Sequence, residues 1–386
     1  MKKPLEFILG DTSQEEFLAK YYQQQALHIK GKSDKFKDLF DWSSLNNVLN
    51  SVRHPHKNIK MSQNGTQFKP SDATAIISAA QQGASLIVEH IGRHDTNLGY
   101  FLNRLTAEIN EETRFNMYLS QPDNQAYDNH YDTQDFFIFQ VSGYKEWCIY
   151  PETIESALFH QKEHGRKAPP EDSLYLNCTL SPGDVLYVPQ GHWHYAIAKN
   201  EPSVHLTLAM FVKTGIDFLN WLADELTGNK KFRKALPLIL SPDKNCDSEG
   251  SEGFERLKSE LEEVLEKGDL WNKFLDYRSA TNNDRQAFNF PSHISPPQNY
   301  SGDSLFERRV NQVRISDCRE ADKIKLISSG RLLKFNKSSE ALVRFMFTSH
   351  KFSFTGLNEV TSEVTKVEVE EILTLLTKEG FISQIK

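Results

Sequence analysis

A series of short apolar or alternating segments between residues 113 and 213 most constrains what this chain can fold into. The segments are separated by Gly, Pro, Asn and Asp, and they read TRFNMYLS, DFFIFQV, KEWCIY, SLYLNCTL, DVLYVP, YAIA and SVHLTLAMFV. Short strand-like segments separated by turn residues at this spacing predict a β-sandwich or a barrel. We therefore expect a β-rich core in this part of the chain.

Helical patterns flank the β-rich region. Before it, Thr12 with Glu15, or Ser13 with Glu16, forms a capping box that predicts a helix start. A short strand, ALHIK, is expected next, and then helices over DWSSLNNVLNS, SDATAIISAAQQG and TNLGYFLNRLTAEIN. We expect helices to dominate this first part.

After the β-rich region, IDFLNWLADEL and FERLKSELEEVLEKGDLWNKFLDY predict paired helices, separated by the polar loop SPDKNCDSEGSEG. Residues 279–303 lack a period and are rich in Asn, Pro and Ser, which indicates a linker. A small terminal unit follows, with helices over SSEALVRFMFTS and TKVEVEEILTLLTKEG and a closing strand, FISQIK.

Composition excludes several classes of protein. The 386 residues carry a formal net charge of -7, which argues against a surface built to hold nucleic-acid phosphates. The four cysteines lie far apart without metal-binding or disulfide-framework spacing, which indicates a reducing compartment. No apolar stretch reaches the ~20 residues of a spanning helix, and the amino terminus makes a poor signal peptide. We expect a cytoplasmic protein.

The segment NHYDTQDFFIF places His130 and Asp132 two residues apart at the start of a predicted buried strand. Successive side chains of a strand point to opposite faces, so His130 and Asp132 share one face and Tyr131 points away. Two such side chains can bind one metal ion. An isolated His-x-Asp is a weak signal, because a strand histidine is more often a hydrogen-bonded core residue.

A second source of histidine ligands lies in SPGDVLYVPQGHWHYAIA, where His192 and His194 follow a predicted strand and turn. Either histidine can complete a set of two histidines and one carboxylate. That set occupies one face of an octahedral Fe(II) ion and leaves three positions for a bidentate co-substrate and dioxygen, so it indicates oxygenase chemistry. Zinc would prefer a closed tetrahedral set.

Taken together, NHYDTQDFFIFQVSGYKEWCIY and GDVLYVPQGHWHYAIA resemble the JmjC-type cupin core of the 2-oxoglutarate-dependent ribosomal oxygenases. The resemblance is strong from 113 to 213 and looser elsewhere. It selects His194 over His192 as the third ligand and assigns His192 to packing or a solvent-facing position. The matching positions are His130, Asp132, Gln140, Gly143, Lys145, Trp147, Gly183, Asp184, Leu186, Tyr187, Pro189, Gly191 and His194.

The resemblance also implies a co-substrate pocket. It assigns Lys145 to the distal carboxylate of 2-oxoglutarate, which needs a cation in a site shielded from water. Asn116 and Tyr118 match polar positions that line the co-substrate, and Thr207 is a weaker candidate from the opposite wall. The alternatives are a solvated hairpin lysine and ordinary packing inside the barrel. His205 either points into the barrel near the co-substrate or is a satisfied core histidine.

The fold that the resemblance implies is α+β: a double-stranded β-helix (cupin or JmjC jelly roll) with added helical parts. Residues 1–112 would be an amino-terminal elaboration, 113–213 the cupin core, 214–300 a helical dimerisation region with a linker, and 301–386 a winged-helix-like domain. We expect a homodimer because the paired helices would otherwise expose Trp221, Leu222 and Leu226. Packing within one chain is the alternative. Acidic residues outnumber lysines in the last predicted helix, so we expect no direct nucleic-acid binding.

The function that follows from the resemblance is that of an Fe(II)- and 2-oxoglutarate-dependent dioxygenase. With O2, 2-oxoglutarate and a protein or peptide substrate, it would hydroxylate a side chain. A basic ribosomal protein would suit an acidic enzyme. Alternatives are a hydroxylase of a natural-product precursor peptide, a more distant lysine demethylase, and a non-catalytic metal-binding cupin that acts as a sensor or assembly module.

Overall fold

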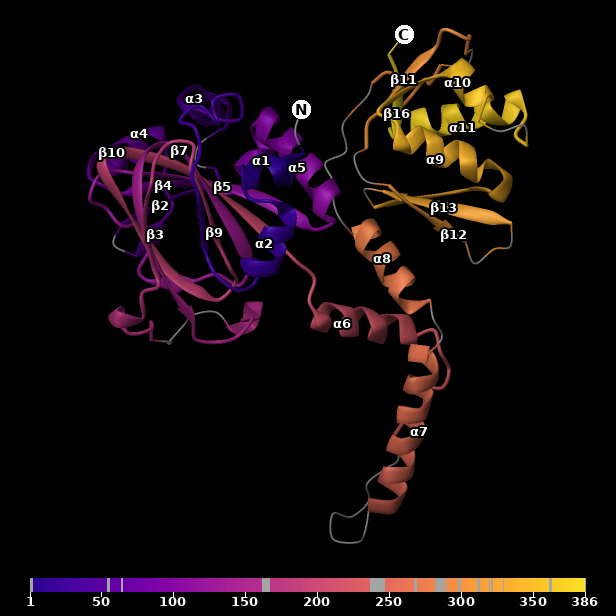
Figure 1. Cartoon of the computed structure of the whole chain (residues 1–386), viewed down its shortest axis with the longest axis horizontal. Helices are drawn as coiled ribbons and strands as arrows, with labels where there is room; N and C mark the ends of the chain where they lie inside the picture. The colour runs from indigo at the N-terminus through magenta and orange to yellow at the C-terminus, as the bar shows by residue number, and fades with distance from the viewer. Residues whose placement is uncertain are drawn as a thin grey trace. The chain divides into compact units, whose positions relative to one another are not determined.

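The structure is a computed structural model that describes residues 3–385, except for 54–55, 64, 162–166, 237–246, 267–268, 282–287, 289, 298–299, 311–312, 319, 321, 329 and 361–362. The chain divides into two compact units, Met1–Val212 and Lys213–Lys386 (Figure 1). None of the helices in the described residues has the length and apolar character of a membrane-spanning segment.

A ten-stranded antiparallel sheet organises the first unit. Its order is β1-β9-β7-β10-β5-β4-β2-β3, with β6 paired to β10 and β8 paired to β7. The strands are β1 (Leu27–Ile29), β2 (Ile59–Gln63), β3 (Thr66–Phe68), β4 (Ser85–Val88), β5 (Glu112–Ser120), β6 (His130–Tyr131), β7 (Asp135–Glu152), β8 (Leu176–Leu180), β9 (Val185–Val188) and β10 (His192–Phe211).

Two long strands, β7 and β10, form the centre of this sheet, where the sequence predicts shorter separate strands. In β7 the predicted strands 135–141 and 145–150 join through Gly143, which has a φ of +68°. A Cβ atom at Gly143 would lie 2.4 Å from the carbonyl oxygen of Pro202, so this position requires glycine. The chain therefore continues through an irregularity in the β7–β10 pairing instead of ending its strand there.

Helices cover part of the sheet and share its core. They are α1 (Pro4–Leu9), α2 (Gln14–Lys20), α3 (Trp42–Ser51), α4 (Ala73–Gln81) and α5 (Thr96–Ile109). Side-chain caps begin four of them, including Ser13 for α2 as predicted. Phe36 stacks on Phe139 at 5.0 Å between ring centroids, and Phe115 meets Phe139 edge-on. This aromatic packing fixes the strands that carry the candidate site.

The expectation that helices dominate the first part is only partly correct. Helices α2 to α5 lie close to their predicted positions, but β2, β3, β4 and the short α1 are not predicted. Strand β4 has the sequence SLIV and is buried throughout, and a buried run of four residues cannot be assigned from periodicity alone. Mixed helix and antiparallel sheet, as the α+β prediction states, is nevertheless what the structure shows.

Three helices begin the second unit: α6 (Gly215–Leu226), α7 (Asp247–Glu266) and α8 (Leu270–Thr281). Trp221 and Leu222 are buried, and the Trp221 ring lies 5.3 Å from that of Phe274 on α8. The reason given above for a dimer, exposure of these side chains, is therefore wrong. Helix α8 covers them within the chain, which is the alternative of intramolecular packing.

The second predicted helix of this pair is in fact two helices, α7 and α8, and α7 already begins at Asp247, inside the predicted polar loop. Gly250 and Gly253 make that segment resemble a loop, but both lie within the helix. Residues 241–246 of the predicted loop and 282–287 of the predicted linker lie outside the described residues.

The terminal part of the second unit contains two three-stranded antiparallel sheets, β15-β11-β16 and β12-β13-β14. The predicted helices α9 and α11 and strand β16 are present, whereas β11 to β15 and α10 are not predicted. The elements are β11 (Leu305–Arg308), β12 (Arg314–Asp317), β13 (Lys323–Ser328), β14 (Arg331–Asn336), α9 (Glu340–Thr348), β15 (Lys351–Ser353), α10 (Phe354–Asn358), α11 (Lys366–Lys378) and β16 (Ile382–Gln384).

Candidate metal and co-substrate site

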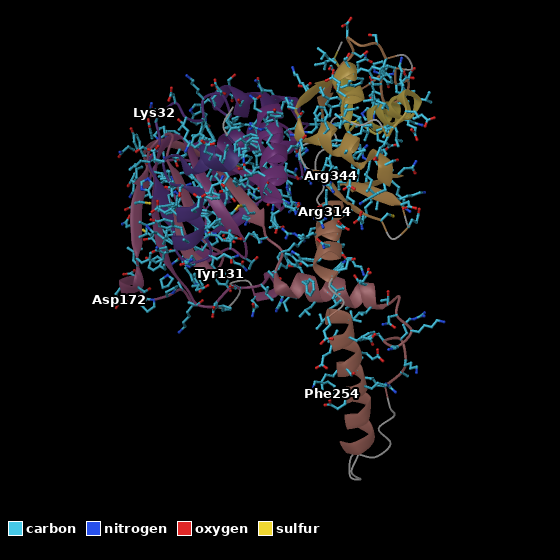
Figure 2. All side chains as sticks on the ribbon, turned by 45° about the vertical axis from the view of Figure 1, so that its right-hand side comes forward. Lys32, Tyr131, Asp172, Phe254, Arg314 and Arg344 are labelled. Atoms are coloured by element: carbon cyan, nitrogen blue, oxygen red, sulfur yellow. The ribbon has the colours of Figure 1, made fainter. Side chains whose placement is uncertain are left out.

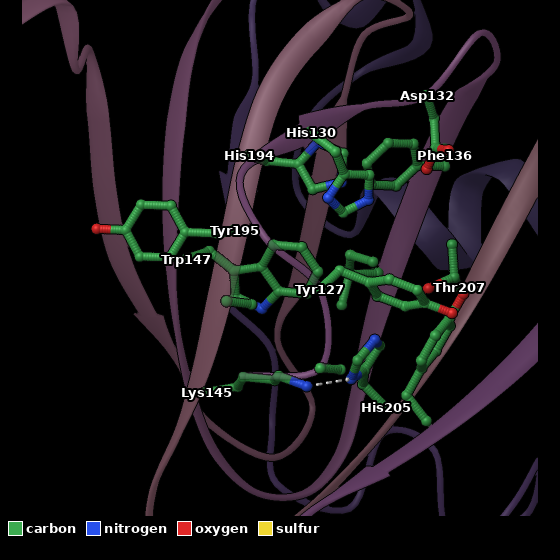
Figure 3. Close-up of a pocket in the computed structure, with 14 residues that line it drawn as sticks. Tyr127, His130, Asp132, Phe136, Lys145, Trp147, His194, Tyr195, His205 and Thr207 are labelled. Carbon is green, nitrogen blue, oxygen red and sulfur yellow. Dashed lines mark hydrogen bonds between the residues drawn. The ribbon is translucent and has the colours of Figure 1, made fainter. Parts of the chain in front are cut away.

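Antiparallel pairing brings the candidate metal ligands together. Strand β6 pairs with β10 so that His130 lies opposite His194 and Tyr131 lies opposite Trp193. The centroids of the two histidine rings are 4.4 Å apart, and Asp132 is the first residue after the end of β6. Potential ligand atoms of His130, Asp132 and His194 all lie within 4.8 Å of one another, so these side chains have the spacing that one metal ion requires (Figure 3).

Backbone carbonyl groups orient both histidine rings. His130 Nδ1 lies 2.8 Å from the carbonyl oxygen of Asp128, and His194 Nδ1 lies 3.0 Å from that of His192. A carbonyl oxygen can only accept, so each Nδ1 carries the proton and each Nε2 has a free lone pair for a metal. Burial lowers the pKa of His194 to about 4, with a further contribution from His130, which keeps the ring neutral.

His192 lies outside this group of ligand atoms. Its Nδ1 is 2.7 Å from the hydroxyl group of Tyr175, and burial lowers its pKa to about 4. The pairing of β10 with β7 shifts register between His192 and His194, so the two side chains do not share surroundings despite their spacing. His192 is nearly buried, which agrees with the predicted packing role and not with a solvent-facing one.

A cavity extends from the three candidate ligands into the sheet. Its lining combines polar groups with apolar and aromatic side chains, which restrict water: Tyr118, Ala126, Tyr127, His130, Asp132, Phe136, Ile138, Lys145, Trp147, His194, Tyr195, Ala196, His205 and Thr207 (Figure 3). Cavities of this kind, apolar with a few convergent polar groups, are typical of ligand sites.

Lys145 lies inside this cavity. Its exposed fraction is 2%, so the alternative of a solvated hairpin lysine is wrong. The Nζ atom donates to Ser120 Oγ at 3.0 Å and lies 3.4 Å from His205 Nδ1. Burial lowers the pKa of Lys145 to about 7. A buried amine without a carboxylate partner in the described part of the chain has the chemistry of a receptor for an anionic ligand.

The other predicted co-substrate residues lie in or beside the cavity. Tyr118 and Thr207 line it, and burial raises the pKa of Tyr118 well above its usual value, so its hydroxyl group stays protonated. Asn116 is opposite Thr207 in the β5–β10 pairing. Its Oδ1 accepts from the backbone N–H of His90 at 2.9 Å, which leaves its amide group to hydrogen-bond Tyr118.

Ser120 and Tyr127 hydrogen-bond predicted site residues and are not themselves predicted. Ser120 continues the alternation of Asn116 and Tyr118 along β5, so its position was available from the period of the strand. Tyr127 lies in the loop between β5 and β6, where no period exists to signal it. Its ring is 5.4 Å from His130, and its hydroxyl group hydrogen-bonds Tyr118.

Comparison with known proteins agrees with this geometry. Residues 94–218 match the JmjC domain family. A Dictyostelium discoideum protein named bifunctional lysine-specific demethylase and histidyl-hydroxylase NO66 is 25% identical over 291 residues, which cover 69% of this chain and 54% of that protein. Human ribosomal oxygenase 1 is 27% identical over 256 residues, which cover 60% of this chain and 39% of the human protein. The chain thus spans about half the length of the first relative and less of the second.

A solved structure is similar over nearly the whole chain. The Escherichia coli ribosomal oxygenase YcfD, in complex with cobalt and 2-oxoglutarate, has a TM-score of 0.63 and 13% sequence identity, and the match covers 97% of this chain and 99% of that one. At this identity the likeness concerns the fold. It confirms the expected cupin-like JmjC fold within a mixed α and β architecture.

Proposed function

This chain belongs to the JmjC-type ribosomal oxygenase family, and from that premise we propose that it is an Fe(II)- and 2-oxoglutarate-dependent oxygenase that hydroxylates a protein or peptide side chain. In this reaction one atom of O2 enters the substrate C–H bond to give C–OH. The other atom enters 2-oxoglutarate, which loses CO2 and becomes succinate. Bound iron supplies the activation of dioxygen, which protein side chains cannot perform alone.

One observation supports this proposal above all: a two-histidine, one-carboxylate set and a buried lysine occupy the same cavity. The donor set fits Fe(II), because neutral imidazole and carboxylate ligands on one side leave positions open for other ligands. Under this proposal His130, Asp132 and His194 hold the metal. Burial of Lys145 beside these residues is unfavourable, because its ammonium group loses its hydration. A cupin without catalytic activity would gain nothing that offsets this cost, whereas an oxygenase gains a binding group for its co-substrate.

The remaining residues of the cavity have roles in binding and in excluding water. Lys145 would bind the distal carboxylate of 2-oxoglutarate, with Asn116, Tyr118 and Thr207 lining the co-substrate. Phe136 and Trp147 pack against His194 at 5.0 and 6.0 Å between centroids, which limits access of water to the ligand set. A dry site strengthens the attraction between lysine and carboxylate because water does not screen it.

The substrate that we propose is a side chain of a ribosomal protein. The relatives carry the names ribosomal oxygenase and histidyl-hydroxylase, and a net charge of -7 favours association with a basic protein. Loops near the cavity mouth, such as the one that carries Tyr127, would select the residue to be hydroxylated.

We also propose the four-part division into 1–112, 113–213, 214–300 and 301–386, in which the last part is a winged-helix-like domain. We further propose that the chain binds no nucleic acid directly and that it forms a homodimer. A dimer interface would use apolar side chains that stay exposed in the second unit. Ile216 and Leu219 on α6 are 49% and 56% exposed, and Phe254 projects from α7 (Figure 2). Covering such side chains is the usual reason for helices to associate across a two-fold axis.

The experiment that tests the proposed function uses the full chain loaded with Fe(II). It is incubated with 2-oxoglutarate and with an extract of ribosomal proteins from a strain that lacks the gene, and succinate and protein masses are measured. We expect succinate formation together with a gain of one oxygen atom on one ribosomal protein. Succinate without any modified protein would refute the ribosomal substrate, and no succinate at all would refute the oxygenase.

A further inference from the structure

Strand β6 is only two residues long, yet it carries His130 and directly precedes Asp132. In the described part of the chain it pairs with β10 alone, at two positions. Such a short pairing contributes little by itself, because even an isolated hairpin of ordinary length is marginally stable in water. Further contacts are therefore needed to hold the segment that bears two of the three candidate ligands.

Tyr131 and Trp193 lie on the opposite face of these strands from the candidate ligands. Tyr131 lies between His130 and Asp132, and Trp193 directly precedes His194, so the two-residue period turns both rings away from the cavity. They are opposite each other in the β6–β10 pairing and meet edge-on, with their centroids 5.1 Å apart. Both are almost completely buried. A shift of either ring consequently shifts the backbone that carries a candidate ligand.

Residues 153–161, which follow the end of β7, accept hydrogen bonds from both of these side chains. The hydroxyl group of Tyr131 donates to the carbonyl oxygen of Gln161. The indole N–H of Trp193 donates to Thr153 Oγ1 at 2.9 Å. The 153–161 segment is thus attached at its two ends to β6 and to β10.

The turn before β10 is attached to the middle of the same segment. Gln190 Nε2 donates to the carbonyl oxygen of Ala157 at 2.5 Å. Ala157 is fully buried, in one cluster with Tyr131 and Trp193. Each of the three pieces that position the candidate ligands, namely β6, the turn and β10, therefore has its own hydrogen bond to the 153–161 segment.

We propose that Tyr131 and Trp193 are positioning residues for the metal site and that they act through the 153–161 segment. This inference rests on the proposed function, because it requires the three candidate ligands to bind a metal ion. Contacts on the outer face preorganise the ligand side chains, so less ordering has to accompany metal binding. The coupling is reciprocal: bound metal stabilises the 153–161 segment by the same factor by which the segment strengthens metal binding.

Two variants remove hydrogen bonds of the 153–161 segment without changing a candidate ligand. Tyr131→Phe removes the hydroxyl group and keeps the ring. Thr153→Val removes the acceptor of the Trp193 N–H at an exposed position. Dissociation constants for Mn(II) are measured by calorimetry on the full chain, without co-substrate or turnover. We expect each variant to bind Mn(II) about two- to tenfold more weakly, the range that one neutral hydrogen bond contributes.

Tyr150→Phe and Thr179→Val are the matched controls. Tyr150 is another buried tyrosine of the same cluster, and its hydroxyl group hydrogen-bonds Tyr195. Thr179 is an exposed threonine on β8. Both controls should bind Mn(II) as the wild-type chain does. Equal weakening in the variants and in their controls would overturn the inference, because the effect would not depend on the 153–161 segment.

Hydrogen exchange tests the reciprocal effect. Amide exchange of residues 153–161 is measured by mass spectrometry with and without saturating Mn(II). We expect Mn(II) to slow this exchange in the wild-type chain and to slow it less in Tyr131→Phe. Helix α4, which packs on β2 and β4, is the internal control and should exchange at the same rate in both conditions. Exchange of residues 153–161 that ignores Mn(II) would contradict the coupling.

The outcomes distinguish this inference from the proposed function. A wild-type chain that does not bind Mn(II) refutes the proposed function, and this inference with it. If the wild-type chain binds Mn(II) and both variants keep its dissociation constant, the inference alone is overturned, since lower stability with unchanged metal affinity is what purely structural packing predicts. Should Tyr131→Phe fail to fold, Thr153→Val decides, because an exposed substitution leaves the core intact.

Discussion

His130 and His194 lie directly opposite each other on the antiparallel strands β6 and β10, with their ring centroids 4.4 Å apart. Because one pairing register positions both rings, the candidate metal site depends on the contact between two strands that are distant in the sequence. Asp132 lies next to this pairing, and the carbonyl oxygen of Asp132 accepts from the backbone N–H of Gly191 at 2.8 Å. The turn before β10 is thereby attached to the segment that carries the first two candidate ligands.

The first prediction concerns removal of a ligand. Loss of a group that hydrogen-bonds a metal ligand typically weakens metal binding by ~10–100-fold. His130→Ala or Asp132→Ala removes a proposed direct ligand, so Fe(II) or Mn(II) binding should weaken by more than that. The far-ultraviolet circular dichroism should stay the same. Metal content after dialysis measures the effect. His192→Ala serves as the comparison and should retain metal, and loss of metal in His192→Ala with retention in His194→Ala would mean that the third ligand is the other histidine.

The second prediction concerns Lys145. Lys145→Met fills a similar volume but leaves the distal carboxylate without a charge partner, so 2-oxoglutarate binding should weaken by roughly 2–5 kcal/mol. Binding of Mn(II) alone should barely change, since Lys145 is not among the ligand atoms. Lys145→Arg should recover part of the affinity through its fixed charge, although its planar head differs in shape. Calorimetry with each ligand provides the measurement, and wild-type 2-oxoglutarate affinity in Lys145→Met would remove this residue from the site.

Much of the site follows from strand alternation. His130 with Asp132, and Asn116 with Tyr118, are pairs at i and i+2, and the structure places each pair as the two-residue period predicts. Alternation cannot choose between His192 and His194, because these residues are also two apart. The structural reason for the difference is the register shift between them, which depends on pairing with β7 and has no local sequence signal.

The fold shows the same division between local and long-range information. A helix start with a side-chain cap is predicted well at Ser13 for α2, because the cap contact lies within three residues. The element that packs against the apolar face of a helix cannot be identified from the sequence of that helix alone. The apolar pattern around Trp221 is the same whether a second chain or α8 buries this side chain. The residue that packs against it, Phe274, is more than fifty positions away in the sequence, so the local pattern does not identify it.

The third prediction concerns the oligomeric state. Ile216 and Leu219 are three residues apart on α6 and both are exposed, so they lie on one side of the helix. The double variant Ile216→Asp, Leu219→Asp should shift the proposed dimer toward monomer, because the interface would have to bury two carboxylates. Light scattering over a range of concentrations measures the shift.

The double variant Asn46→Asp, Asn47→Asp offers a matched control for this test, since it adds the same two charges at exposed polar positions of a different helix, α3. It should leave the dimer intact. Substitution of Trp221 is a poor test of the interface, because its burial against Phe274 means that its loss would damage the fold of the unit itself. A monomeric wild-type chain at high concentration would contradict the dimer.

The last prediction follows from the pKa of Lys145, which burial lowers to about 7. Below that pH the free site already holds an ammonium group, and above it the amine is mostly neutral. The carboxylate of 2-oxoglutarate favours the ammonium form, so binding above pH 7 must be accompanied by uptake of a proton at Lys145. The affinity for 2-oxoglutarate should therefore fall as the pH rises above about 7, by up to roughly tenfold per pH unit, and should change little between pH 6 and 7 through this group.

Calorimetry of the Mn(II)-loaded chain in two buffers with different ionisation enthalpies measures the proton directly. At pH 8.5 we expect the binding heats to differ between the buffers by an amount that corresponds to nearly one proton taken up, and at pH 6 this contribution from Lys145 should vanish. Lys145→Arg is the control, because arginine stays charged over this range and should bind without the uptake that Lys145 contributes. Equal heats in both buffers at pH 8.5 for the wild-type chain would show that Lys145 is already an ammonium group in the free site, and that its burial does not regulate its protonation.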